Sequence, residues 1–506
     1  MLHVTDMAAK RAELTPDRVA FIDDETGEPL TFATVNDRAE RLARGLMALG
    51  AQKGDRIGIL CHNRPDFFVF LFACQKARLV LVPLNWRQPP AELLPLIEQA
   101  DIGILAVDGA FAGVADALSK TRPLTRFGME AGVAGADADL DTLVADHPAG
   151  PLDTRPVAAG DTWYLLYTSG TTGLPKAVIQ TPAMAWANAI NYAQATDLVS
   201  TDRSINFLPL FHTAGINLLT LPLFLTGGCS RILRKFDADR VLDLVDRGEV
   251  TAFFGVPAIY QAMALSERFD ATDFSAVRSF GCGGAPLAEP LIRAFARKGI
   301  GVCNGMGMTE TGPTVFLNDP AHAESKIGSV GKPQILAETR IVTAEGTVIE
   351  GAGEGELQIR GPGVTPGYRG NPEATDAAFT PDGWLKTGDV ARRDGDGYYY
   401  IVDRIKDMYI SGGENVYPAE VERVLVDFDG VLEAAVIGVP DDRWGEVGEA
   451  YLIARPNEDI DIEALPAWCR ERLAAYKIPK RFHVVDDMPR TAAGKIQKHA
   501  LRKSSS

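Results

Sequence analysis

A run of hydroxyl side chains, glycines and one lysine is the most chemically specific feature of the sequence. It reads Tyr167-Thr168-Ser169-Gly170-Thr171-Thr172-Gly173-Leu174-Pro175-Lys176 and follows TWYLLY, which predicts a strand. Glycines let backbone N–H groups approach phosphate oxygens, hydroxyls add donors, and a lysine supplies charge. The spacing differs from GxxxxGK[ST], so the pattern indicates a phosphate-binding loop of another kind. A flexible Ser/Gly/Thr loop is the alternative reading.

Two shorter segments carry groups suited to the rest of a nucleotide. Gly305-Met306-Gly307-Met308-Thr309-Glu310 offers a hydroxyl for a phosphate and a carboxylate as a hard ligand for Mg²⁺. Thr387-Gly388-Asp389 precedes Val402-Asp403-Arg404-Ile405-Lys406-Asp407. Read alone, the first two segments are typical of turns, and the charged segment is typical of a solvated surface.

Two further segments lie in the last quarter of the chain. Ser411-Gly412-Gly413-Glu414-Asn415-Val416-Tyr417-Pro418 has paired glycines that permit close backbone approach. Pro489-Arg490-Thr491-Ala492-Ala493-Gly494-Lys495-Ile496 carries one lysine in a small-residue loop. A lysine can offset negative charge that builds on phosphoryl oxygens in a transition state.

Taken in order, these segments resemble the motifs of the adenylate-forming superfamily. This superfamily comprises acyl- and aryl-CoA synthetases, peptide-synthetase adenylation domains and beetle luciferases, and the resemblance covers nearly the whole chain. It implies an enzyme that joins a carboxylic acid to AMP from ATP and then passes the acyl group to coenzyme A. ATP, Mg²⁺ and CoA are the implied cofactors.

The resemblance also implies a role for individual residues. Lys495, Thr309, Glu310 and His212 would be catalytic, with Glu310 holding the metal ion. The nucleotide would be contacted by Thr168, Ser169, Gly170, Thr171, Thr172, Gly173, Lys176, Gly284, Ala285, Pro286, Met306, Gly307, Asp389, Arg404 and Lys406, the last being the pivot of a mobile domain. CoA would be contacted by Gly412, Gly413, Trp444, Tyr476, Lys477 and Lys480. The sequence departs from the pattern at Met306, where the family usually has an aromatic residue.

The acid is expected beside Phe211-His212-Thr213-Ala214-Gly215-Ile216-Asn217, with His212 as a gate toward CoA. Other residues matched to the pocket are Thr213, Phe254, Gly281, Gly283, Gly305 and Met306. We expect the three glycines to leave volume for an extended apolar or aryl acid. Asn191 and Asn217 are the polar groups available at its end. Medium- to long-chain fatty acids and phenylpropenoid acids both fit such a pocket.

Strands and helices alternate in the part of the chain that must position these residues. Val35, Leu42, Leu46 and Leu49 share one helical face, and Gly50 is a predicted stop. DRIGILC and LVLVPL then predict buried strands on either side of a helix in PDFFVFLFACQKA. This order predicts an α/β fold with a parallel-rich sheet and helices on both faces. We expect a large N-terminal domain, 1–404, and a small mobile α+β domain, 405–506.

Composition limits the possible partners. The chain has 506 residues, 46% hydrophobic, with a formal net charge of −16, so a phosphate backbone would be repelled and nucleic acid is not an expected partner. Six cysteines form no CxxC pair, and the start has no apolar signal core, so we expect a cytoplasmic protein with free thiols. The longest apolar stretch, near 207–228, predicts a buried helix rather than a membrane span. A monomer and a homodimer are both compatible.

The predicted function is AMP-forming ligation of an acid to CoA. Three alternatives remain: an adenylation enzyme that loads a carrier protein, an acyl-AMP ligase or luciferase-like oxygenase, and a nucleotide-binding protein without catalysis. No carrier-domain serine motif follows Lys495, which disfavours the first. The set Lys176, Glu310, Asp389, Arg404 and Lys495 favours a catalyst over the last.

Overall fold

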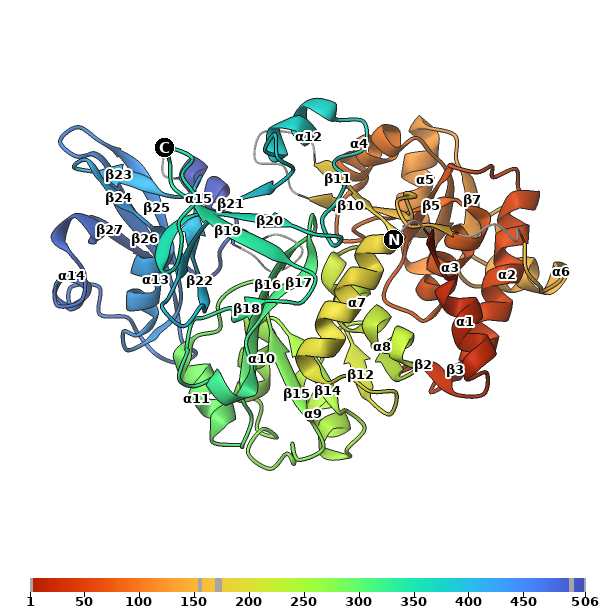
Figure 1. The fold of residues 1–506 in the computed structure, drawn as a ribbon, viewed down its shortest axis with the longest axis horizontal. Helices are drawn as coiled ribbons and strands as arrows, with labels where there is room; N and C mark the ends of the chain where they lie inside the picture. Colours follow the sequence, from red (N-terminus) through yellow and green to blue (C-terminus); the bar gives the residue numbers. More distant parts are fainter. Residues whose placement is uncertain (1–2, 153–156, 169–174, 491–495, 505–506) are drawn as a thin grey trace. The chain divides into compact units, whose positions relative to one another are not determined.

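The computed structural model describes residues 3–152, 157–168, 175–490 and 496–504, without the side chains of 503 and 504 (Figure 1). The chain forms two compact units. The first comprises Met1–Ser325, Pro333–Glu338 and Arg360–Gly383, and the second comprises Lys326–Lys332, Thr339–Ile359 and Trp384–Ser506. The expected boundary at residue 404, between a large N-terminal domain and a mobile C-terminal domain, stays a prediction.

A seven-stranded sheet organises the beginning of the first unit. Its strands, in spatial order, are β11 (Lys176–Gln180), β10 (Tyr164–Thr168), β5 (Val80–Pro83), β4 (Arg56–Leu60), β6 (Ile102–Val107), β7 (Thr125–Gly128) and β8 (Ala138–Asp139). All neighbours pair in parallel except β10 and β11. This is the parallel-rich sheet that the sequence predicts.

Helices cover both faces of this sheet. They are α1 (Met7–Leu14), α2 (Phe32–Ala48), α3 (Asp66–Ala77), α4 (Pro90–Ala100), α5 (Ala112–Thr121) and α6 (Leu140–Asp146). Leu81 packs in a core with α2 and α3, whereas Val80 and Val82 pack in a second core with α4 and α5. Successive side chains of a strand point to opposite faces, so a continuous apolar run is what two covered faces require.

The first long helix shows how local sequence sets these elements. The Thr31 hydroxyl accepts a hydrogen bond from the backbone N–H of Thr34 and caps α2. Val35, Leu42 and Leu46 are fully buried on its inner face, as their spacing predicts. Gly50, with φ +97°, follows the helix end, and glycine adopts this left-handed conformation without the steric clash that a Cβ would cause.

Besides a two-stranded sheet of β1 (His3–Val4) and β9 (Val157–Ala158), the described residues of the first unit form two more sheets. One contains β12 (Arg203–Asn206), β13 (Cys229–Ile232), β2 (Val19–Asp23) and β3 (Pro29–Thr31), and the other contains β14 (Ala252–Gly255), β15 (Ser279–Cys282), β16 (Val302–Met308), β17 (Gly312–Leu317) and β18 (Lys332–Pro333). The helices that accompany them are α7 (Pro182–Thr196), α8 (Thr220–Thr226), α9 (Ala238–Asp246), α10 (Pro257–Leu265), α11 (Glu289–Ala296) and α12 (Pro372–Ala378).

Where the structure describes it, the second unit contains two sheets and three α-helices. Strands β19 (Glu338–Val342), β20 (Gly353–Arg360), β21 (Leu385–Arg393) and β22 (Tyr399–Arg404) form the first sheet. Strands β24 (Glu414–Val416), β23 (Tyr409–Ser411), β26 (Gly445–Ala454) and β25 (Val431–Asp441), with β27 (Arg481–Val484) beside β26, form the second. Its helices are α13 (Pro418–Val426), α14 (Leu465–Arg470) and α15 (Lys498–Ser504).

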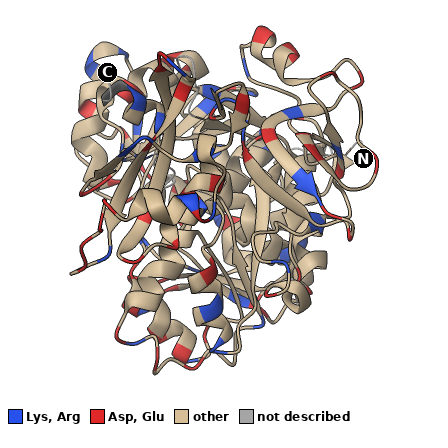
Figure 2. Ribbon diagram, turned by 90° about the vertical axis from the view of Figure 1, so that its left-hand side faces the viewer, with Lys and Arg blue, Asp and Glu red and all other residues tan. Residues whose placement is uncertain are grey.

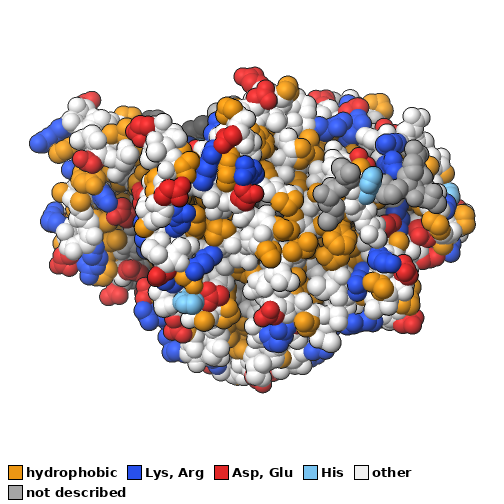
Figure 3. All heavy atoms as spheres, viewed as in Figure 1, with side chains coloured by type: hydrophobic (Ala, Val, Ile, Leu, Met, Phe, Trp, Pro, Cys, Tyr) orange, Lys and Arg blue, Asp and Glu red, His pale blue; other side chains and the backbone are white. Residues whose placement is uncertain are grey.

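Charged groups of both signs are mixed along the helices and loops, as Figure 2 shows. Hydrophobic side chains on the face in Figure 3 are interrupted by charged and other polar ones. Among the described residues, no helix is long and apolar enough to cross a membrane. The stretch near 207–228 instead contains a π-helix, Ala214–Leu218, and the short helix α8.

Candidate active site

The expected phosphate-binding loop connects two paired strands of the first unit. Strands β10 and β11 are antiparallel, and their register places Thr168 directly opposite Lys176. The loop residues Ser169, Gly170, Thr171, Thr172 and Gly173 lie outside the described residues. The strands therefore fix the two ends of the loop, Thr168 and Lys176, beside each other.

A tyrosine that no sequence pattern singles out joins the lysine to the expected metal ligand. The ammonium of Lys176 lies 4.8 Å from the centre of the Tyr368 ring, and the Tyr368 hydroxyl donates to Glu310 Oε1 at 3.0 Å. Burial, together with the Glu310 charge, raises the pKa of Tyr368, so the phenol keeps its proton. Tyr368 thus orients the carboxylate of Glu310.

Backbone contacts hold the Thr309–Glu310 segment against β11. The Gln180 side-chain amide donates to the Thr309 carbonyl at 2.8 Å, and the Thr365 backbone N–H donates to the Glu310 carbonyl at 2.7 Å. The Thr365 hydroxyl in turn donates to the Ile179 carbonyl at 2.7 Å. Only the folded chain identifies Gln180 and Thr365, because they lie far from residue 310 in the sequence.

The single carboxylate of Glu310 suits Mg²⁺, which also binds substrate phosphates and water, better than it suits a metal ion that is held by protein side chains alone. Among the described residues, no group of three or more His, Cys, Asp or Glu side chains could hold a metal ion. Mg²⁺ commonly binds through one or two carboxylates together with substrate phosphates and water. A single, oriented carboxylate beside a phosphate-binding loop meets that requirement.

The glycine before this segment is required by packing. A Cβ on Gly307 would lie 2.3 Å from the Pro313 carbonyl carbon, so only glycine allows β16 and β17 to approach here. The pairing of these strands shifts register between Met306 and Met308. Met306 is half-buried at this irregularity, without the aromatic ring that the family usually has there.

The expected ribose motif forms part of a hairpin in the second unit. Strands β21 and β22 pair Asp389 with Arg404, and Arg404 Nε lies 2.7 Å from Asp389 Oδ1. The Thr387 hydroxyl accepts from the Asp389 backbone N–H at 3.0 Å and donates to the Leu357 carbonyl at 2.7 Å. These contacts fix a carboxylate that is 4% exposed.

The expected hinge is a hydrogen-bonded turn that starts at Arg404. Its carbonyl accepts from the backbone N–H groups of Asp407 at 3.0 Å and Met408 at 3.2 Å. Ile405 donates its backbone N–H to the Gly388 carbonyl, which ties the turn to the ribose motif. Lys406 is exposed at the tip of the turn.

Four of the expected CoA-contacting residues lie together. Gly412 and Gly413, with φ of +62° and +88°, form the two-residue turn between β23 and β24. A Cβ on Gly412 would lie 2.8 Å from the ring of Trp444, and the Lys480 ammonium lies 5.9 Å from that ring's centre. Lys477, in contrast, forms an ion pair with Glu420 at 2.7 Å, and Tyr476 packs against the core of this unit.

Lys495 lies outside the described residues, but the segments on either side of it are anchored. Arg490 and Ile496 form a β-bridge, and Arg490 pairs with Glu433 of β25. After the loop, Lys498 lies 2.7 Å from Glu422 of α13.

The expected acid-binding segment contains the π-helix Ala214–Leu218, a rare element that often marks functional sites. Asn217 within it accepts from the Tyr164 hydroxyl at 2.7 Å and donates to the Thr213 hydroxyl at 3.0 Å. His212 immediately precedes Thr213 and is half-buried. The polar contacts thus fix the turn that carries His212. Gly284, Ala285 and Pro286 are exposed after β15.

The glycines of the expected acid pocket differ from the sequence expectation. A Cβ on Gly281 would lie 2.4 Å from Phe254 Cδ2, and one on Gly283 would lie 2.9 Å from Phe254 Cζ. The Phe254 ring therefore occupies the volume that these glycines leave. A Cβ on Gly305 would meet the Phe316 carbonyl oxygen at 2.9 Å, so this glycine permits strand pairing. The expectation of open volume at all three positions is corrected.

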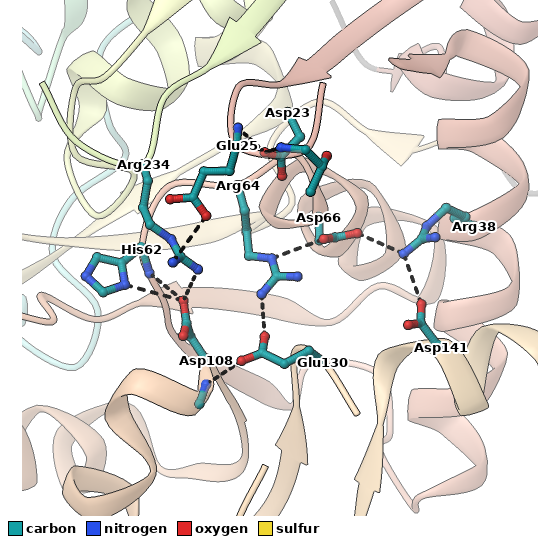
Figure 4. Close-up of polar contacts among 12 residues, drawn as sticks. Asp23, Glu25, Arg38, His62, Arg64, Asp66, Asp108, Glu130, Asp141 and Arg234 are labelled. Carbon is teal, nitrogen blue, oxygen red and sulfur yellow. Dashed lines mark hydrogen bonds and ion pairs between the residues drawn. The ribbon is translucent and has the colours of Figure 1, made fainter. Parts of the chain in front are cut away.

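A separate ion-pair network lies at the carboxyl ends of β4, β6 and β7. Figure 4 shows Arg64 between Asp66 and Glu130, at 3.1 Å and 2.6 Å, and Asp108 between His62 and Arg234. Because each cation drawn here faces a carboxylate, the network is compatible with a structural role.

Comparison with known proteins agrees with these motifs. Residues 8–369 match the family described as AMP-binding enzyme, and residues 420–495 match the AMP-binding enzyme C-terminal domain. A feruloyl-CoA synthase of Amycolatopsis sp is 41% identical to this chain, and the match covers 98% of this chain and 97% of the synthase. The long-chain-fatty-acid–CoA ligase FadD13 of Mycobacterium tuberculosis is 36% identical to this chain, and the match covers 100% of this chain and 99% of the ligase.

A solved structure resembles the whole chain. The o-succinylbenzoate coenzyme A synthetase MenE of Bacillus subtilis, in complex with ATP and magnesium ion, is 33% identical, has a TM-score of 0.86, and is matched over 98% of both chains. The expected α/β fold class and the cofactor set of ATP, Mg²⁺ and CoA are thereby confirmed. The chain belongs to the AMP-binding, adenylate-forming enzymes, and within them to the acyl- and aryl-CoA ligases.

Proposed function

We propose that this ligase activates an aryl acid of the arylpropenoate type. The carboxylate attacks the α-phosphorus of ATP, pyrophosphate leaves, and an acyl adenylate forms. The sulfur of CoA then attacks the acyl carbonyl, its thiol proton passes to solvent, and AMP leaves. No covalent bond to the protein is required.

The contact of Tyr368 with both Lys176 and Glu310 is the main structural support for ATP binding and adenylation in the first unit. It brings a cation and a carboxylate together beside the ends of the phosphate-binding loop. Lys176 would bind phosphate oxygens and Thr309 would donate a hydroxyl to them. Glu310 would hold Mg²⁺, which offsets phosphate charge when bound.

Residues of the second unit would hold the rest of ATP and complete the reaction. Asp389 would accept from the ribose hydroxyls, and its pairing with Arg404 supports that role because it fixes the carboxylate. Lys495 would offset charge on the α-phosphate during the first step. Gly412 and Trp444 would bind CoA in the second.

The proposed acid class is supported by the position of Phe254. Its ring fills the space over Gly281 and Gly283, so these two glycines leave no open channel for a long chain. The relative named feruloyl-CoA synthase supports the same class. A long-chain fatty acid is the competing class, supported by the likeness to FadD13.

An acid panel tests this proposal. Pyrophosphate release with free CoA would be measured for benzoate, cinnamate, ferulate, dodecanoate and oleate. We expect the highest kcat/KM for cinnamate or ferulate, and a preference for oleate would overturn the proposed class. Release of pyrophosphate without consumption of free CoA would indicate the acyl-AMP ligase or carrier-loading alternatives.

A matched pair of variants locates the selectivity. Phe254→Leu removes the ring from Gly281 and should raise the ratio of kcat/KM for dodecanoate to that for ferulate by about tenfold. Phe253→Leu is the control, because the neighbouring side chain points to the opposite face of β14 and packs with Phe280. Equal ratios in the two variants would contradict the role of Phe254.

A further inference from the structure

A cavity of about 210 Å³ lies in the first unit, and none of its lining residues is among those assigned above to ATP, CoA or the acid. Its lining includes Lys53, Gln75, Arg78, Asp161, Trp163 and Arg369. Leu79 and Trp163, which immediately precede β5 and β10, also line it, so the cavity lies at the amino ends of these two strands. Its volume is below the roughly 300–1,000 Å³ of pockets for drug-sized ligands, which suits a small ligand.

The charges around this cavity do not cancel. Three cationic side chains and one carboxylate line it, in a protein of net charge −16. Among the described residues, Lys53, Arg78 and Arg369 form no ion pair with a carboxylate. The arginines of the ion-pair network at the carboxyl ends of β4, β6 and β7 do face carboxylates (Figure 4). The cations of the cavity differ from them in this respect.

A buried amide adds a second indication that a ligand belongs here. Gln75 is 5% exposed, and its side-chain oxygen has no hydrogen-bond partner among the described residues. A buried polar group without a partner is costly, so each one calls for an explanation. The amide can turn to present either its oxygen or its NH₂ group to a ligand in the cavity. The Trp163 indole N–H, by contrast, is satisfied by the Leu71 carbonyl at 2.8 Å.

The backbone at Arg78 allows the side chain to be removed without straining the fold. Arg78 ends α3 with φ +56° and ψ +34°, a left-handed conformation that is common at helix ends and that favours glycine. Replacing Arg78 by glycine therefore suits this backbone.

We propose that this cavity binds a small phosphate-type oxyanion, such as inorganic phosphate, pyrophosphate or the phosphate group of a metabolite. The planar guanidinium groups of Arg78 and Arg369 present paired N–H donors that match phosphate geometry, and Lys53 adds a compact charge. The amide NH₂ of Gln75 supplies a donor within the cavity. This site is separate from the proposed ATP site and does not depend on it.

The strands β10 and β11 connect the two sites. Thr168 and Lys176 mark the ATP end of the pair, whereas Tyr164 and Gln180 mark the cavity end. At roughly 3.3 Å per residue, the five steps from Trp163 to Thr168 span about 17 Å. Arg369 donates its backbone N–H to the Ala177 carbonyl at 2.9 Å and directly follows Tyr368, which contacts Glu310. An anion held by Arg369 is thus one residue from the side chain that orients the proposed metal ligand.

Calorimetric titration with inorganic pyrophosphate tests the proposal. It would be run without Mg²⁺ on the wild type, Arg78→Gly and Lys176→Ala. We expect a binding event that Lys176→Ala retains and that Arg78→Gly weakens at least about tenfold, the loss typical of one charge-assisted hydrogen bond. Binding that Lys176→Ala abolishes while Arg78→Gly retains it would assign the anion to the ATP site and overturn the proposal, as would an absence of binding to every form.

The Arg78→Gly variant separates binding from folding. Glycine relieves the left-handed backbone, so its Tm should equal or exceed that of the wild type while binding falls. Asn457→Gly is the matched control, because Asn457 also has a positive φ, of +64°, in the second unit and should leave pyrophosphate binding unchanged. Lys53→Ala, at an exposed position, should weaken binding without lowering Tm. Wild-type binding in both Arg78→Gly and Lys53→Ala would rule the cavity out.

Discussion

The proposed phosphate-binding and ribose-binding sites are built in opposite ways. Lys176, Glu310 and Tyr368 come from separate segments, and the Tyr368–Glu310 contact alone joins residues 58 positions apart. Asp389 and Arg404 face each other across the single hairpin formed by β21 and β22. The first site therefore depends on tertiary packing for its geometry, whereas the second depends on the register of two neighbouring strands.

The difference indicates which function each site can serve. A hairpin can orient one carboxylate for binding, but the reacting phosphates need a cation, a hydroxyl and a metal ligand from several directions. We expect changes in the first site to lower the rate of adenylation and changes in the second to weaken ATP binding. The following variants separate these outcomes.

Lys495→Ala should have the largest effect. Loss of one charge donor aimed at a transition state typically costs about 10²–10³ in rate, so adenylation should fall by that factor. Transfer from supplied acyl adenylate to CoA should stay close to the wild-type rate. The two half-reactions would be measured separately, and an equal loss in both would contradict the role of Lys495.

Tyr368→Phe should lower the apparent affinity for Mg²⁺ about 10- to 100-fold, the usual cost of removing a group that orients a metal ligand. The ring, and hence its contact with Lys176, remains. The measurement is adenylation rate against Mg²⁺ concentration. Tyr167→Phe is the control, because that hydroxyl donates to the Leu96 carbonyl and not to Glu310. An unchanged Mg²⁺ dependence in Tyr368→Phe would remove Glu310 as the metal ligand.

Asp389→Asn should raise the KM for ATP by about tenfold or more, because hydrogen bonds to charged groups contribute roughly 1.5–3 kcal/mol. Its kcat should change little, since ribose contacts are similar in the ground and transition states. Asp396→Asn, at an exposed aspartate of the same sheet's turn, is the control. A fall in kcat at unchanged KM would place Asp389 in the reaction rather than in binding.

Lys406→Pro should have the smallest effect, a several-fold slowing of thioester formation with adenylation retained. Proline fixes φ near −65°, and a pivot must change its dihedral angles. Lys406→Ala leaves φ free and should be mild in both half-reactions. If the alanine variant is as slow as the proline variant, the lysine side chain matters and the backbone pivot is refuted.

Much of the fold could be predicted from local patterns. The apolar face of α2, its Thr31 cap and its end before Gly50 follow from spacing and residue type. The parallel sheet follows from alternating strands and helices, because buried parallel strands need helices on both faces. The pairing of Asp389 with Arg404 also rests on short-range order, since both belong to one hairpin.

Contacts between distant segments could not be predicted in this way. Tyr368 gave no signal, because nothing in its neighbours indicates that it meets Glu310. The glycines at 281 and 283 suggested open space, and only the packed structure places the Phe254 ring on them. Lys477 was expected to be available to CoA, and its ion pair with Glu420 is a tertiary contact.

The sequence by itself determined the family, the fold class and the order of the motifs, because each motif is a short run whose residue types suit one chemical task. The tertiary structure alone decided which side chains meet and which volumes are filled. The cavity with Arg78 and Arg369 is the clearest case. Its cationic side chains come from distant segments of the chain, so only folding brings them to one cavity.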